Sequence, residues 1–131
     1  MGRIQNAWMI AQANLPNVVS RDNENRAKMV TVPGTEGKFY DVIIRRNGIL
    51  TTECLLSTGI GHRDCLGNNT SVCYHSLAAL IKVAPESKCR VMAICKTRAD
   101  AERRARIDGQ VIEVKSRQSN KSMFLVIEKE P

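Results

Sequence analysis

Large aromatic side chains are scarce in this chain, which has one tryptophan, two tyrosines and two phenylalanines among 131 residues. A small domain buries only part of its unfolded surface, so a core short of large rings gains from a bound metal ion. Long apolar runs are also lacking, because no run exceeds five residues, as in 77–81, which is far too short to span a bilayer. The amino terminus lacks the apolar segment of a secretory signal peptide. We therefore expect a cytoplasmic protein with no membrane partner, and the nucleus or a host's cytoplasm stays open.

Histidine is just as scarce, and both histidines fall in one stretch with three of the five cysteines. The members of this cluster are Cys54, His62, Cys65, Cys73 and His75. Thiolate sulfur and imidazole nitrogen are the ligands of structural zinc, which takes four of them in a tetrahedron. In a reducing cytosol the thiols stay free to bind metal. The sequence therefore predicts a zinc site in the middle of the chain.

Motifs of catalytic zinc are missing from the sequence. A catalytic site keeps one position open for water and usually has a carboxylate to move protons, but neither HxE nor HExxH occurs. A nucleophilic pair of Cys73 and His75 would need an orienting acid, and the sequence suggests none. Cys89 and Cys95 lie beside or within an apolar segment and are expected to be buried as small apolar residues. We expect a closed structural site and no enzyme.

The first half of the chain changes from a helical to a strand period. Apolar spacing predicts a short helix over 3–14, followed by a polar segment that forms a capped turn or a short helix with Ser20 as its cap. Residues 28–54 then predict a three-stranded antiparallel meander, in which Asn47-Gly48 favours a type I′ hairpin. A long loop is expected over 55–72. A metal would hold such a loop in place, since long structureless segments are unfavourable in small domains.

The second half predicts a helix over 74–83, ended by Pro85, and then a βαββ unit. The unit has strands over 90–95, 110–116 and 123–128 and a helix over 99–107 that begins at a capping box, Thr97 to Asp100. We therefore predict an α+β fold of one domain. Its segments are an N-terminal helical segment (1–25), a zinc-binding module (26–85) and a basic βαββ unit (86–131) packing on the same core.

The order of elements around the cluster carries a family resemblance. A strand hairpin ends in Cys54, and Cys73-x-His75 opens an apolar helix. Residues 26–84 therefore resemble the SWIM zinc finger, in which a β-meander carrying C-x-C precedes C-x-H at the start of a helix. The second cysteine of the C-x-C is replaced here by Leu56. The resemblance implies a zinc-binding module used for contact with DNA or with protein.

The missing ligand would have to come from the loop, from Cys65 or, as the alternative, from His62. We predict that Cys54, Cys65, Cys73 and His75 bind the zinc. In this arrangement a strand end and a loop supply two sulfurs. The start of a helix supplies the other two ligands, where the helix dipole favours a thiolate. Zinc would thus fasten the meander to the helix.

The chain is basic, with a net charge of +7, which favours contact with nucleic acid. Two groups of arginines are candidates: Arg45 and Arg46 at the hairpin tip, joined by Arg63 near the metal loop, and Arg98, Arg103, Arg104 and Arg106 around one short helix. A solvated helix face balanced by neighbouring acids is the alternative for the second group. Base stacking has only Phe39, Tyr40 and Tyr74 to draw on. Sequence-specific readout is therefore not expected.

These observations predict a zinc-stabilised, nucleic-acid-binding accessory or regulatory protein, with DNA favoured over RNA. An adaptor between proteins, in which zinc is purely structural, is the alternative. A metal-free α+β domain with buried thiols is the third interpretation.

Overall fold

A computed structural model of the chain describes residues 3–13, 27–34, 37–47, 49–58, 60–65, 72–83, 89–105 and 109–129. Within them the fold is mixed α+β, with more strand than helix. The elements in chain order are α1 (Arg3–Ala13), β1 (Ala27–Pro33), β2 (Phe39–Asn47), β3 (Ile49–Thr58), β4 (Gly61–Asp64), α2 (Tyr74–Val83), β5 (Cys89–Cys95), α3 (Arg98–Arg104), β6 (Gln110–Ser116) and β7 (Ser122–Lys129). None of the described helices is long and apolar enough to cross a membrane. The turn or short helix predicted around Ser20 and the later part of the loop predicted over 55–72 lie outside the described residues.

The predicted meander is confirmed as the antiparallel run β1–β2–β3. Asn47 pairs with Ile49 and Arg46 with Leu50, whereas a two-residue Asn47-Gly48 turn would pair Arg46 with Ile49, so the hairpin is present but its register differs by one residue from the predicted type I′ turn. Gly48 itself lies outside the described residues. Alternate residues of β3 are buried, because one face of the meander packs on the helices. This alternation puts Cys54 on the buried face, opposite Val42.

The loop predicted over 55–72 is wrong in its first part. β3 continues to Thr58, and β4 folds back beside it in antiparallel pairing. Across the sheet, His62 Nε2 lies 2.8 Å from Asp41 Oδ2. Gly, His, Arg and Asp, the residues of β4, are not ones that strands favour, so the pairing with β3 and the contact with Asp41 decide their conformation. The chain thus returns along β3 before it reaches α2.

The predicted βαββ unit is confirmed in its order, β5–α3–β6–β7. The side-chain oxygen of Thr97 accepts a hydrogen bond from the Asp100 N–H at 3.2 Å, as the capping box predicts. The helix ends at Arg104, earlier than predicted, because Ala105 has an extended backbone and packs against the strands. Residues 106–108 lie outside the described part.

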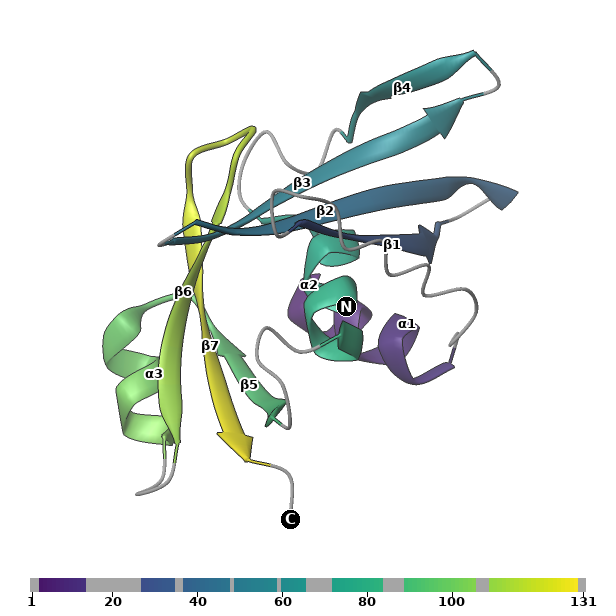
Figure 1. Ribbon diagram of the computed structural model, residues 1–131. Helices are drawn as coiled ribbons and strands as arrows, with labels where there is room; N and C mark the ends of the chain where they lie inside the picture. Colours follow the sequence, from purple (N-terminus) through teal and green to yellow (C-terminus); the bar gives the residue numbers. More distant parts are fainter. Residues whose placement is uncertain are drawn as a thin grey trace.

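A short parallel pairing joins the unit to the meander. Residues 50–52 of β3 pair with residues 114–116 of β6. One seven-stranded sheet results, in the order β1-β2-β3-β6-β7-β5 with β4 beside β3, and Figure 1 shows how strongly it curls. The two halves of the chain therefore share a sheet.

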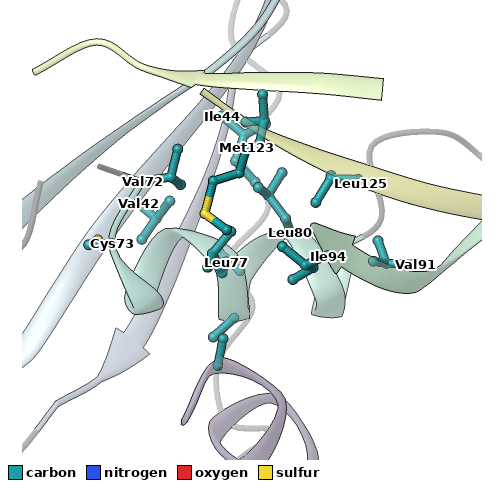
Figure 2. Close-up of a cluster of buried hydrophobic side chains, with 14 of the residues drawn as sticks. Val42, Ile44, Val72, Cys73, Leu77, Leu80, Val91, Ile94, Met123 and Leu125 are labelled. Atoms are coloured by element: carbon teal, nitrogen blue, oxygen red, sulfur yellow. The ribbon is translucent and has the colours of Figure 1, made fainter. Parts of the chain in front are cut away.

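The main core lies between α2 and one face of this sheet. Figure 2 shows Leu77 and Leu80 of α2 facing Val42, Met123 and Leu125 of the strands, all of them buried. α1 packs against α2 on the same side of the sheet, while α3 covers the opposite face of the C-terminal strands (Figure 1). Aliphatic side chains supply nearly all of this core, as the scarcity of aromatic residues requires.

Candidate metal centre

Four side chains converge where β3, β4 and α2 meet. Cys54 lies on β3, Cys65 directly follows β4, Cys73 directly precedes α2, and His75 is in the first turn of α2. The Cys65 N–H donates to the Cys54 carbonyl oxygen at 3.1 Å, so the return of β4 brings these two cysteines together. The Cys73 carbonyl oxygen accepts from the Leu77 N–H at 3.1 Å, which fixes the other two ligands at the start of the helix. The structure thus brings together all four residues predicted as ligands.

Their donor atoms have the spacing of a metal site. All four atoms lie within 4.8 Å of one another, and all four residues are buried. Cys65 Sγ lies 3.5 Å from His75 Nδ1. In a tetrahedral zinc site, bonds of about 2.3 Å to sulfur and about 2.0–2.1 Å to nitrogen would place such atoms about 3.6 Å apart. The cluster can therefore hold a metal ion of this size and geometry.

The start of α2 provides hydrogen-bond donors to Cys73, although, against a lowering hydrogen bond with Cys54, a hydrogen bond with Cys65 and burial leave the pKa of the Cys73 thiol raised. Its Sγ accepts from the Ser76 N–H at 3.5 Å and lies 3.4 Å from Ser76 Oγ. The unsatisfied N–H groups of a helix start carry partial positive charge, which stabilises a thiolate. This position therefore suits a sulfur that binds a cation.

The His75 imidazole is held by two tyrosine rings. Tyr40 of β2 stacks on it with a centroid separation of 3.7 Å and an interplanar angle of 20°, and Tyr74 contacts it at 4.0 Å and 38°. Nδ1 faces the Cys65 sulfur, whereas Nε2 is buried and forms no hydrogen bond with another described residue. The rings thus fix the imidazole with Nδ1 toward the sulfurs.

Proton binding and metal binding compete at this centre. Hydrogen bonds with the Cys65 and Cys73 thiols, and then burial, raise the pKa of the Cys54 thiol far above its ordinary value. Burial, followed by the charge of Cys65, also raises the pKa of Tyr40 and of Tyr74. Without a cation the site therefore favours a neutral Cys54. A divalent cation must displace that proton, so metal affinity falls as the pH falls.

The other cysteines and the second histidine do not join the cluster. His62, the alternative ligand, pairs with Asp41 on the sheet instead. Cys95 is buried and Cys89 is partly buried against apolar neighbours, as expected for small apolar residues. The donor set in the described part of the chain is thus three cysteines and one histidine.

The arginines predicted to contact nucleic acid do not gather on one surface. Arg45 pairs with Thr51 across the sheet, and Arg46 follows it toward the hairpin tip. Arg63 is exposed opposite Leu56, five residues further along β3. Five strand residues span about 17 Å, so the expectation that Arg63 joins the hairpin tip is wrong.

Acidic neighbours already engage several of these arginines. The ion pairs are Arg45–Glu53 at 3.1 Å, Arg98–Glu113 at 3.3 Å and Arg103–Asp100. The Arg98 guanidinium also lies 5.0 Å from the centre of the Phe124 ring. Arg104 is exposed and forms no ion pair with another described residue, and Arg106 lies outside the described part. The α3 arginines thus resemble the balanced, solvated face considered as the alternative.

Sequence reasoning misses two features of the centre. Tyr40 and Tyr74 are among the few rings available for base stacking, but in the structure their rings contact His75. The carboxamide of Gln118, in the turn between β6 and β7, hydrogen-bonds the backbone of Cys54 from 64 positions away. The Cys73-Tyr74-His75 motif gives a local signal for one tyrosine, whereas nothing local could identify the glutamine.

The fold and the centre define an α+β protein with a buried cluster of three cysteines and one histidine that could hold a metal ion. Comparison of the chain with models of known protein families, with curated proteins and with solved structures gave no match. The functional argument therefore rests on the donor set, its geometry and the charge of the surface.

Proposed function

We propose that this chain is a zinc-stabilised, non-enzymatic protein that binds nucleic acid, with a metal centre of the SWIM type in which Cys65 replaces the second cysteine of the C-x-C. The observation that carries the proposal is the buried set of Cys54, Cys65, Cys73 and His75 with donor atoms within 4.8 Å of one another. Soft thiolate ligands with an imidazole favour zinc over magnesium or calcium, which take oxygen ligands.

The surroundings of the centre support a structural role for the ion. Among the described residues the cluster contains no carboxylate, and the exposed fraction of each ligand is 5% or less. Four protein ligands complete a tetrahedron, which leaves no position for water or substrate. The ion would join β3, β4 and α2. It would supply stability that a core with few aromatic residues lacks.

Surface charge supports the nucleic-acid part of the proposal. Besides the three arginine pairs, Asp41 contacts His62, and Asp64 accepts a hydrogen bond from Gln118. Much of the acidic charge is therefore engaged within the protein. The excess of Lys and Arg in the chain, which gives the net charge of +7, is left to act on partners.

We place the contact with phosphates beside the metal centre. The 2.9 Å hydrogen bond from Gln118 Nε2 to Asp64 Oδ1 holds the β6–β7 turn against β4. Arg63 on β4 and Arg117 and Lys121 on the turn are all exposed. We call these three residues the metal-side basic surface. None of them forms an ion pair with another described residue, so each is available to a phosphate.

The test measures binding to a labelled mixed-sequence DNA duplex, and to RNA of the same sequence, over a series of salt concentrations. We expect affinity to fall steeply with salt, because each phosphate contact releases about one counterion. The triple variant Arg63→Gln, Arg117→Gln and Lys121→Gln should weaken binding and reduce the slope of log affinity against log salt by up to about 3.

A matched control removes three exposed positive charges elsewhere: Lys82→Gln, Lys96→Gln and Arg104→Gln. This variant has the same net charge as the first, so an equal loss of affinity in both would contradict the metal-side basic surface. Absence of binding at low salt by the zinc-loaded protein would overturn the nucleic-acid proposal in favour of an adaptor between proteins.

A further inference from the structure

One edge of β3 changes partner beside the metal centre. Residues 50–52 pair with β6, and residues 55–58 pair with β4. Cys54 lies in the interval between these two partners, where no strand hydrogen-bonds its N–H group. A backbone N–H left unpaired beside a buried ligand would cost free energy. The edge therefore needs a substitute for a strand at this residue.

The Gln118 side chain provides that substitute. Its Oε1 accepts from the Cys54 N–H at 3.1 Å, and its Nε2 donates to the Cys54 carbonyl oxygen at 2.9 Å. The same amide nitrogen donates to Asp64 Oδ1 at 2.9 Å, next to the ligand Cys65. One carboxamide thus pairs with the Cys54 N–H as a neighbouring strand would, and it adds a second donor to the Cys54 carbonyl oxygen, which also accepts from the Cys65 N–H. It extends to Asp64, the residue before the second cysteine.

The turn that carries Gln118 is itself firmly held. Buried Ser116 accepts at Oγ from the N–H groups of Gln118 and Ser119, both at 3.3 Å. The Arg117 N–H donates to the Thr52 carbonyl oxygen at 2.9 Å, which continues the line of β6 along β3. The backbone of the turn therefore fixes where the carboxamide lies.

We propose that Gln118 is a positioning residue of the metal centre, which holds Cys54 and, through Asp64, Cys65 at the spacing that the ion requires. This inference rests on the proposed metal site and deepens it, because it makes the C-terminal unit part of the centre. Only a carboxamide serves: glutamate lacks the donor for the Cys54 carbonyl and Asp64, and leucine lacks both donor and acceptor.

The test compares zinc release from the full-length wild-type chain, Gln118→Leu and Gln118→Glu, each loaded with one equivalent of zinc and mixed with a chromogenic chelator. Residues that orient metal ligands typically change metal affinity about 10- to 100-fold when replaced. We expect zinc affinity to fall by about that factor in both variants, with correspondingly faster release. Gln110→Leu, the same replacement at an exposed glutamine at the start of β6, should release zinc as the wild type does.

Wild-type release rates in both Gln118 variants would overturn the proposal, and so would release from Gln110→Leu as fast as from the Gln118 variants. NMR of the zinc-loaded wild type keeps the proposal testable even if a variant fails to fold. We expect slow solvent exchange for the Cys54 N–H and the Gln118 side-chain amide, and exchange as fast as in a free glutamine would contradict the hydrogen bonds. If the wild-type chain binds no zinc, the proposed metal site itself is overturned. If the Gln118 variants bind zinc as tightly as the wild type does, only the role of Gln118 is overturned.

Discussion

Gly34 and Tyr40 show how single residues outside the ligand set support the centre. The Gly34 N–H donates to the Lys38 carbonyl oxygen at 2.8 Å, in the connection between β1 and β2. A Cβ atom at Gly34 would overlap the Tyr40 ring, whose Cδ2 lies 2.9 Å from its position. The same ring stacks on the His75 imidazole, so it cannot shift without disturbing a ligand. Glycine is therefore required by the packing of the ring.

Gly34→Ala is expected to destabilise the zinc-loaded protein by about 1–3 kcal/mol, the usual cost of overpacking, because the added methyl group displaces Tyr40 from His75. The measurement is the free energy of unfolding in urea. Tyr40→Leu supplies the control: in the double variant the alanine should add little further loss, since the overlapping ring is gone. Additive effects of the two substitutions would show that Gly34 does not act through Tyr40.

Individual elements differ in how far their own sequence determines them. Residues 74–83 form α2 as predicted, because an apolar helical run follows Cys73 and the next proline ends it. The meander and the Thr97 cap of α3 are also confirmed, since the Asn47-Gly48 turn and the capping box are local signals. β4 is missed, because its residues favour no strand and it is held by its partner β3 and by contacts with Asp41 and Gln118, which are distant in sequence.

The ligands of the candidate centre could be predicted from the sequence for a different reason. Few residue types can ligate zinc, so the clustering of the cysteines and histidines indicates Cys65 even where the strand that carries it is missed. Gln118 is an ordinary polar residue in a turn, and its role depends on the parallel pairing of β3 with β6. Contacts between distant segments are therefore what the sequence does not reveal.

The whole molecule is built on one sheet that both halves of the chain complete. β6 supplies the partner for part of β3, and the turn after it supplies Gln118 to Cys54. Six buried side chains of the C-terminal strands belong to the same core as α2: Val91, Ile94, Val114, Met123, Leu125 and Ile127. The zinc-binding half should therefore depend on the C-terminal half for its stability.

A fragment of residues 26–85 is accordingly expected to remain unfolded even with zinc. Each buried apolar side chain contributes about 1.5–3 kcal/mol, so loss of these six removes about 9–18 kcal/mol, which is comparable to the stability of a whole domain. Circular dichroism and the amide chemical-shift dispersion of the fragment, compared with the full chain under the same zinc concentration, provide the measurement. A cooperative, zinc-dependent unfolding transition in the fragment would show that this half is self-sufficient.

Coordination of zinc by the four clustered residues is the claim on which the account depends most. Zinc K-edge X-ray absorption of the full chain, loaded with one equivalent of zinc, measures that coordination directly. We predict one zinc per chain, with three sulfur ligands at about 2.3 Å and one nitrogen at about 2.0–2.1 Å. Cys73→Ser should lose one sulfur from this shell, while Cys89→Ser should leave it unchanged. A shell that contains oxygen in the wild type, fewer than three sulfurs, or no bound zinc would contradict the account.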